Sequence, residues 1–429
     1  MCDSIKPRAV LAQPLAKFNA GKGFCSRMTG IRHVDLTETQ VASSETARRI
    51  NRDIILELIR ENQPTSRIEL SRASGLQKST VSQIVEQLIS ENWVVERAVG
   101  ATPRGRRPTL LGLNEHIVAI AVDVHPRMAI VAVVDLNGRL LSQSKVPVTS
   151  EPAASTRLIV DCIRRFKAFF TDRAIEGIGV SLPGRVDPES QRLTFAPNLR
   201  WPDFDLKGAI EGEFGLQVSM ENAATACLLA ELTFGRMDGI RDIALVTISE
   251  GIGAGVFADG RIISGAHGMA GEFGHIPLDP EGPRCGCGRK GCWEMYASCR
   301  AAVGYYRKRR AGNKDVSFQE LLNLAEEGSK DAQEALEQQA LYIGRGLRIV
   351  IASLSPALIL IAGEITSAWH RFEGIIAKEV KSYVLAGTPP RIIPTHEGEM
   401  ARLRGAAALV FQRQIARPHS AGDAGSRQA

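Results

Sequence analysis

Hydrophobic residues between residues 45 and 91 recur at intervals of three and four, the spacing of one face of a helix. This spacing predicts a first helix that ends before Pro64, a second that begins with a capping box between Ser66 and Glu69, and a third over residues 78–91. A tight turn at residues 74–76 separates the last two helices. The residues expected to face inward are Ile50, Ile54, Ile55, Leu58 and Ile59 in the first helix, Ile68, Leu70 and Ala73 in the second, and Val81, Ile84, Val85 and Leu88 in the third.

Two short strands, residues 93–95 and 109–111, follow the third helix and enclose a loop rich in Gly, Pro and Arg. This order of elements is typical of a winged helix-turn-helix, whose last helix enters the major groove of DNA. A plain three-helix bundle with an exposed polar face is the alternative, but residues 46–110 hold eleven Lys/Arg against seven Asp/Glu. Side chains expected to contact bases are Gln77, Lys78, Ser79, Thr80, Ser82 and Gln83. Loop arginines expected to contact phosphates or the minor groove are Arg104, Arg106 and Arg107.

Beyond Asn114 the pattern changes to short apolar strands. Strands are predicted at residues 117–124, 129–136 and 140–141, followed by a helix over 154–170 and a strand over 175–181. The strand, strand, hairpin, strand order recurs at residues 243–248, 254–258 and 261–263. The repeat predicts two related lobes facing each other across a cleft. The remaining elements are expected to be a mainly helical segment over 318–353, a strand over 357–361 and a last helix over 404–414.

Composition sets the limits of this organisation. The 429 residues are enough for two or three domains, and 44% hydrophobic with 23% charged residues is typical of a globular protein. No apolar stretch is long enough to span a membrane or to form the core of a secretory signal, so we expect a cytoplasmic protein with reduced thiols. The expected domains are a flexible extension over residues 1–45, a DNA-binding domain over 46–113, a larger domain over 114–415 and a loose tail over 416–429.

A cysteine knuckle is the sharpest chemical signal. Cys285, Cys287 and Cys292 form a C-x-C-x4-C pattern in a Gly-rich segment, and His275 lies ten residues upstream. Three thiolates and one imidazole are the ligands of a closed, structural zinc site. The alternative is three reduced surface cysteines with a coincidental histidine. Cysteines outside this spacing are expected to be plain thiols: Cys2, Cys25, Cys162, Cys227 and Cys299.

The same stretch resembles the signature of the ROK family, which contains sugar kinases and sugar-responsive repressors. Further segments that resemble the family are Ser181–Asp187, Pro197–Leu199 with Trp201, Glu221–Asn222 and Gly251–Gly255, and the similarity covers about residues 46–412. The winged helix resembles the repressor branch that responds to xylose, glucose or N-acetylglucosamine. The resemblance implies an α/β protein in which a two-lobed, actin-like ATPase fold follows the winged helix-turn-helix. It also implies an oligomer, a homodimer or dimer of dimers, on a palindromic operator. The residues implied as ligands of a sugar or sugar phosphate are Asn198, Asn222, Glu272, His275 and Glu294.

Three departures from the family's kinases bear on the function. After the first strand, His125, Pro126 and Arg127 replace the Gly-Gly-Thr turn that holds phosphates in the kinases. Ala223 stands where the catalytic Asp is expected. Glu250 opens the second loop and places a carboxylate where a phosphate would need donors. We therefore expect no catalytic residues and no enzyme. The sequence predicts a DNA-binding repressor of sugar-metabolism genes with an inactive kinase-like sensor domain. The alternatives are a sugar kinase with an appended DNA-binding domain and a repressor controlled by a protein partner.

Overall fold

The computed structural model of the chain describes residues 44–99, 109–235, 237, 239–309, 316–382, 388–395 and 400–416. The expected extension up to residue 43, the arginines Arg104, Arg106 and Arg107, and the tail from residue 417 lie outside the described residues. Among the described residues, no helix has both the length and the apolar composition that crossing a membrane requires.

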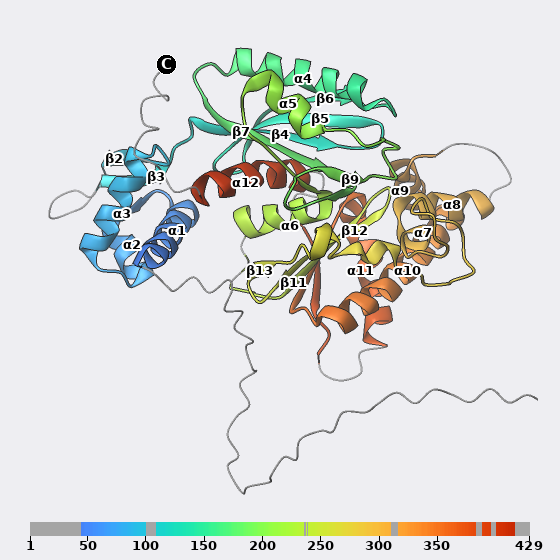
Figure 1. Cartoon of the computed structure of the whole chain (residues 1–429). Helices are drawn as coiled ribbons and strands as arrows, with labels where there is room; N and C mark the ends of the chain where they lie inside the picture. Colours follow the sequence, from blue (N-terminus) through green and yellow to red (C-terminus); the bar gives the residue numbers. More distant parts are fainter. Residues whose placement is uncertain are drawn as a thin grey trace, which may run out of the picture. The chain divides into compact units, whose positions relative to one another are not determined.

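The first elements are those of a winged helix-turn-helix (Figure 1). Their bounds are α1 Ser44–Asn62, β1 Thr65–Ser66, α2 Arg67–Ser74, α3 Lys78–Ser90, β2 Val94–Val99 and β3 Thr109–Leu113. The predicted capping box is confirmed, since the Ser66 and Glu69 side chains each accept a bond from the other's backbone N–H. Gly75 ends α2 with φ 71°, a left-handed conformation that glycine adopts without strain. The three strands pair in the order β1-β3-β2, and β1 was not expected from the sequence.

The predicted inward face is confirmed in α3 but only partly in the two helices before it. Val81, Ile84, Val85 and Leu88 are buried, whereas Ile50, Ile54 and Ile68 are 52%, 43% and 47% exposed. The prediction that Ile68 and Ala73 face inward is wrong, because α2 has only eight residues and buries Leu70 alone. A period counted over so short a helix does not say which of its apolar positions meets the core.

Two five-stranded sheets follow, one in each lobe, with the same topology. Their orders are β10-β7-β4-β5-β6 and β15-β14-β11-β12-β13, each with an antiparallel meander of three strands and two further strands in parallel. The predicted duplication is therefore confirmed. The first sheet comprises β4 Ile117–Val124, β5 Met128–Asp135, β6 Leu140–Pro147, β7 Ala174–Leu182 and β10 Val218–Asn222. The second comprises β11 Ile243–Ile248, β12 Ile252–Ala258, β13 Arg261–Ile262, β14 Leu358–Ala362 and β15 Arg391–Pro394, and a small ribbon, β8 Arg185–Val186 and β9 Leu193–Phe195, forms separately.

Helices cover both faces of each sheet. The remaining helices are α4 Pro152–Phe169, α5 Leu206–Phe214, α6 Ala223–Phe234, α7 Glu294–Ala297, α8 Cys299–Arg309, α9 Phe318–Glu326, α10 Lys330–Leu354, α11 Trp369–Lys381 and α12 Ala401–Ala416, with short 3-10 turns η1 Ala266–Gly268, η2 Glu272–His275 and η3 Glu364–Ala368. The predicted helical segment over 318–353 is interrupted at Gly328, which has φ 91°, and Ser329 then caps α10. Helices α4 and α5 pack on the first sheet, and α8 to α11 enclose the core of the second.

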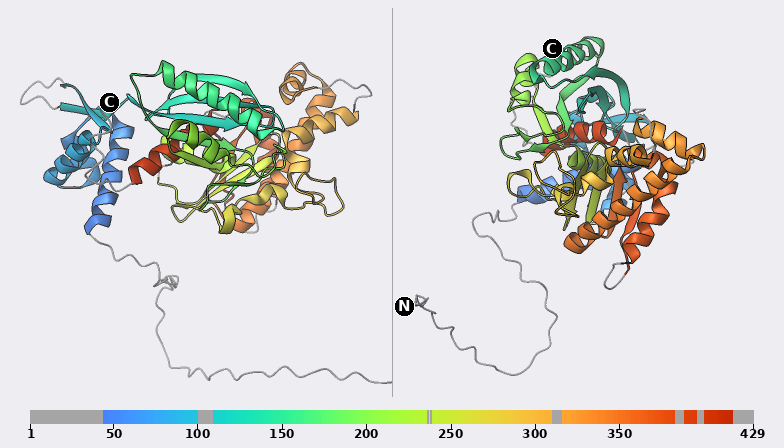
Figure 2. Two further views of the ribbon diagram at one scale, coloured as in Figure 1. Left: turned by 45° about the horizontal axis from the view of Figure 1, so that its top comes forward. Right: turned by 90° about the vertical axis from the view of Figure 1, so that its right-hand side faces the viewer.

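Helices α6 and α12 lie between the two sheets (Figures 1 and 2). α12 packs against β4 and β7 of the first sheet, and α6 packs against β11 and β12 of the second. The two helices also pack directly on each other at Gly405, where any Cβ would overlap the backbone of Ala226. The pair of helices therefore connects the two lobes: α12 lies on the sheet of the first lobe, α6 lies on the sheet of the second, and the two helices contact each other.

Candidate functional site

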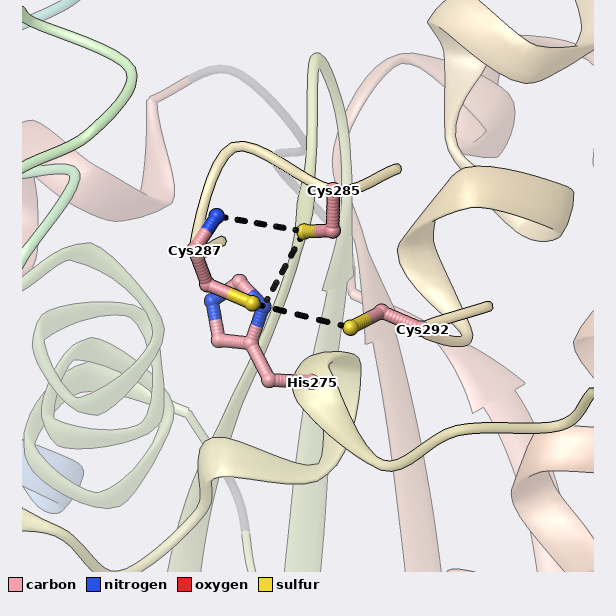
Figure 3. A group of neighbouring side chains, drawn as sticks. All are labelled: His275, Cys285, Cys287 and Cys292. Atoms are coloured by element: carbon pink, nitrogen blue, oxygen red, sulfur yellow. Dashed lines mark hydrogen bonds between the residues drawn. The ribbon is translucent and has the colours of Figure 1, made fainter. Parts of the chain in front are cut away.

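The four predicted zinc ligands converge on one point (Figure 3). His275 ends η2, and the three cysteines lie on the loop that connects η2 to α7. The ligand atoms all lie within 4.8 Å of one another, with 3.6 Å from His275 Nδ1 to Cys285 Sγ and 3.6 Å from Cys287 Sγ to Cys292 Sγ. The loop is folded by backbone bonds from Cys285 N–H to Arg289 and from Gly288 N–H to Cys285.

These residues fit a zinc ion. In a tetrahedral site with zinc–sulfur bonds of about 2.3 Å, neighbouring ligand atoms lie about 3.8 Å apart. Burial raises the pKa of the Cys292 thiol to about 11 and also raises that of Cys285, so the thiolate forms need a cation beside them. Histidine and three cysteines leave no open position, so the ion's contribution would be to hold the knuckle rather than to activate water.

One pocket gathers all five residues that the resemblance implied as sugar ligands: Asn198, Asn222, Glu272, His275 and Glu294. They come from both lobes and from the knuckle, and the first and last of them, Asn198 and Glu294, are more than 90 residues apart in the sequence. Gly251 sits beside two of them, since a Cβ on it would lie 2.7 Å from Glu294 Oε2 and 3.3 Å from Asn198 Nδ2. The absence of a side chain at Gly251 therefore leaves these polar atoms open to the pocket.

His275 joins the metal cluster to the pocket. Its Nδ1 faces Cys285, and its Nε2 lies 3.8 Å from Glu272 Oε2. A metal bound at Nδ1 would fix the ring and leave Nε2–H pointing at the pocket. The knuckle also approaches Glu294, whose Oε1 accepts a hydrogen bond from Cys285 Sγ at 2.9 Å.

Asn222 has a structural task beside any contact with a ligand. Its Oδ1 accepts from Ala224 N–H at 2.8 Å as the N-cap of α6, and its Nδ2 donates to the Gly184 carbonyl at 2.6 Å. The side chain is thereby held in one orientation at the pocket wall. Ala223, the first residue of α6, lines the same pocket and presents only a methyl group.

Sequence reasoning assigned no role to four charged residues of this pocket, although two of them, Arg185 and Glu221, lie in segments that the resemblance named; the four are Glu221, Glu364, Arg185 and Arg402. Arg402 contacts Ser249 and His125, which are 153 and 277 residues away in the sequence, so no local pattern marks it. Glu364 follows the buried strand β14 and Gly363, a position where polar site residues often lie, and this signal was available. Burial raises the pKa of Glu221 to about 6, although a hydrogen bond from Asn222 N–H opposes the shift.

The expected DNA-contacting side chains lie at the start of α3. Gln77, Lys78, Ser79 and Gln83 are exposed, and Thr80 and Ser82 are half-buried. In the described part of the chain, none of these six side chains makes an intramolecular hydrogen bond, and Gln77 precedes the helix without capping it. They are therefore available to an external partner.

Comparisons with known proteins agree with this architecture. The ROK family matches residues 119–413, and a winged helix-turn-helix DNA-binding domain matches residues 48–95. The chain is 32% identical over 378 residues to the xylose repressor of Bacillus spizizenii, covering 87% of this chain and 97% of the repressor.

Two solved structures are similar over most of their length. A ROK family transcriptional regulator, a homolog of the E. coli MLC protein, superposes with a TM-score of 0.72 at 27% identity, covering 86% of this chain and 97% of that one. A ROK family glucokinase from Streptomyces griseus, in complex with glucose and AMPPNP, superposes with a TM-score of 0.63 at 30% identity, covering 69% of this chain and 99% of that one. The predicted resemblance is thus confirmed: the chain belongs to the ROK family and carries a winged helix-turn-helix DNA-binding domain ahead of its ROK domain.

Proposed function

We propose that the chain is a DNA-binding transcriptional repressor of sugar-metabolism genes, whose ROK domain senses a sugar or sugar phosphate without phosphorylating it. Residues 46–113 bind operator DNA, and residues 114–415 bind the effector and form the oligomer. The observation that carries the proposal is one pocket that gathers the five polar residues Asn198, Asn222, Glu272, His275 and Glu294 but presents Ala223 where a kinase needs a base.

The pocket suits the recognition of a polyol. Sugar hydroxyls both donate and accept, and the carboxylates of Glu272 and Glu294 accept strongly from them. The amide of Asn198 and the Nε2–H of His275 can donate to the ring and hydroxyl oxygens. His275, Cys285, Cys287 and Cys292 would hold a zinc ion, which would support this side of the pocket by fixing the knuckle.

Phosphoryl transfer usually needs a general base and a turn whose backbone N–H groups hold the phosphates, and this pocket lacks both at the positions expected from the family's kinases. A methyl group at Ala223 cannot accept the proton of an attacking hydroxyl. The turn after β4 has a proline, Pro126, which has no N–H to offer a phosphate, and His125 N–H is bonded to the Met128 carbonyl at 2.8 Å. These features favour a sensor over the alternative of a sugar kinase with an appended DNA-binding domain.

The DNA-binding part follows the geometry of other winged helices. The start of α3, from Gln77 to Gln83, reads bases in the major groove, and Arg104, Arg106 and Arg107 on the wing contact the backbone or minor groove. A homodimer or a dimer of dimers would place two such readers on a palindromic operator. Binding to operator DNA requires access to the chromosome, so a cytoplasmic location belongs to the same proposal.

One experiment separates the proposal from its two alternatives. An operator selected from random DNA is bound by the purified full-length chain, and D-xylose, D-glucose, N-acetylglucosamine and their phosphates are added while ATP consumption is followed in parallel. We expect at least one of these compounds to release the operator with no ADP formed. Sugar-dependent ADP formation would establish the kinase, and release by cell extract but by no sugar would establish control by a protein partner.

A further inference from the structure

Arg402, in the first turn of α12, joins the first lobe to the second. Its guanidinium donates to His125 Nδ1 at 3.3 Å, just after β4 of the first lobe, and to Ser249 Oγ at 2.8 Å, in the turn between β11 and β12 of the second lobe. Because α12 packs against β4 and β7 of the first sheet, the bond to Ser249 crosses from one lobe to the other. A charged donor makes this bond stronger than one between neutral groups.

On the side of the first lobe, a buried network fixes the guanidinium. A guanidinium can only donate, so His125 Nδ1 accepts from Arg402 and His125 Nε2–H donates to Asp123 Oδ2 at 2.6 Å. Asp123 lies on β4 and is fully buried, and its carboxylate compensates the positive charge of Arg402. Arg402 is therefore held in place by its own lobe before it meets the other.

On the side of the second lobe, the acceptor is also fixed. Ser249 is buried, and its N–H donates to the Gly251 carbonyl at 3.0 Å. The Ser249 carbonyl accepts from Cys299 N–H, at the start of α8, at 2.8 Å. Both ends of the contact between the lobes thus belong to well-anchored parts of the chain.

Glu364 adds an electrostatic attraction between the lobes. It begins η3, directly after β14 of the second sheet, and it lines the pocket together with Arg402. Burial lowers the pKa of Arg402, but the charges of Asp123 and Glu364 outweigh this effect and raise the pKa. The charge of Arg402 is therefore stabilised from both lobes, and moving the lobes apart would remove the share of Glu364.

The bond between Arg402 and Ser249 requires one arrangement of the lobes. A hydrogen bond is lost once donor and acceptor are more than about 3.5 Å apart, so a small rotation of one lobe breaks it. The turn that Arg402 holds also borders the pocket, because a Cβ on Gly251 would lie 2.7 Å from Glu294 Oε2. A change in this contact therefore reaches the pocket wall.

We infer that Arg402 is a latch between the two lobes: its bond to Ser249 holds the turn between β11 and β12 against the first lobe and favours the arrangement described here over a more open one. Movement of two lobes about a cleft is a common two-state change, and a contact made in only one state shifts the equilibrium toward that state. The inference goes beyond the proposed function, because it concerns the lobes themselves and holds whatever ligand the pocket takes.

Ser249→Ala tests the latch with the smallest change. It removes one hydroxyl, the acceptor in the second lobe, and leaves the backbone bonds of the turn and the contact between Arg402 and His125 in place. Hydrogen exchange of the full-length chain, followed by mass spectrometry, reports the opening of the lobes. We expect the amides of the turn at residues 125–128, in the other lobe, to exchange roughly tenfold faster than in the wild type, since a bond to a charged group shifts an opening equilibrium by about this factor.

Ser219→Ala is the matched control. Ser219 lies on β10, is buried like Ser249, and accepts from Arg413 of α12 at 3.3 Å, so the same type of bond is lost within the first lobe alone. Exchange at residues 125–128 and 249–251 should then equal that of the wild type. Faster exchange of Ser249→Ala confined to residues 249–251 would show a purely local role of this hydroxyl and would overturn the latch.

A double-mutant cycle checks that the bond carries the effect, rather than either side chain alone. Arg402→Met removes the donor, so adding Ser249→Ala to it should cause no further increase in exchange at residues 125–128. Additive effects of the two substitutions would contradict the latch. Should Arg402→Met fail to fold, the comparison of Ser249→Ala with Ser219→Ala still decides the inference.

Operator binding by the same proteins relates the latch to the proposed function, on which this second readout rests. If the arrangement of the lobes sets operator affinity, Ser249→Ala should change that affinity by about tenfold with no sugar present, whereas Ser219→Ala should not. Faster exchange with unchanged operator affinity would support the latch and contradict the coupling of the lobes to DNA binding. Unchanged exchange at residues 125–128 would overturn the latch and leave the sensing function intact.

Discussion

Single residues of the pocket were predictable where a motif surrounds them. His275, Glu272 and Glu294 lie next to the cysteine spacing, and the structure places all three in one pocket with Asn198 and Asn222. Arg402 was not predictable, because nothing near it in the sequence signals a partner 153 residues away. Its contacts form only because α12 packs between the sheets, and local sequence patterns do not reveal contacts between residues so far apart in the chain.

The metal ligands give the first prediction at this scale. Cys287→Ser replaces a thiolate with a hydroxyl that zinc binds poorly, so we expect zinc content to fall well below one per chain and the melting temperature to drop. Elemental analysis and thermal denaturation of protein purified without added metal measure both. Cys162→Ser, which removes a buried thiol of α4 outside the cluster, should retain the full zinc content. Full zinc occupancy in Cys287→Ser would refute the ligand assignment.

Glu221 gives a prediction about pH. Burial raises its pKa from 4.5 to about 6, so between these pH values the folded state holds more protons than the unfolded state, and stability falls as pH rises through that window. Glu221→Gln removes the buried charge and should stabilise the protein by roughly 2 kcal/mol at pH 7.5 while changing little at pH 4.5.

Urea denaturation at the two pH values measures this difference. Glu337→Gln, on the exposed side of α10, serves as the control and should change stability little at either pH. Equal effects of Glu221→Gln at both pH values would mean that the carboxyl titrates normally.

At the scale of elements, the sequence predicts those that local rules govern. The box of Ser66 and Glu69, the fully buried strand β4 and the hairpin turn at Asn137–Gly138 follow from capping, burial and turn chemistry. Helix α6 was not predicted, because it is rich in buried Ala, Cys and Leu and shows no polar face. An element packed on several sides loses the period from which helices are recognised.

Helix α3 gives the prediction at this scale. Gln83→Ala should change which operator sequence is preferred, since a base contact contributes about 1–3 kcal/mol of discrimination. Arg106→Ala on the wing should instead weaken binding to all DNA alike and reduce the salt dependence. Fluorescence anisotropy with specific and unrelated duplexes at several salt concentrations compares the two. A change of sequence preference in Arg106→Ala, with an unaltered salt slope, would make the wing a base reader.

At the scale of the whole molecule, function depends on a ligand in one domain changing the affinity of another. A sugar shifts DNA binding only if it binds one arrangement of the lobes more tightly than the other, and a ~100-fold loss of operator affinity needs about 2.7 kcal/mol of such coupling. Closure of two lobes around a small ligand is a common two-state change. Here α6 and α12 connect the lobes, and both begin at the pocket, with Ala223 and Arg402 in their first turns.

Operator release by sugar, compared between the wild-type chain and Glu272→Ala, tests this coupling most directly. Glu272→Ala removes a pocket carboxylate far in sequence from the DNA-binding helices, so both proteins should bind the operator with similar affinity. Glu281→Ala, an exposed carboxylate of the same segment outside the pocket, is the matched control. Anisotropy titrations with and without the releasing sugar should show release of the wild type and Glu281→Ala and little or no release of Glu272→Ala. Equal release of all three proteins would place the effector site outside this pocket and contradict the proposed sensor.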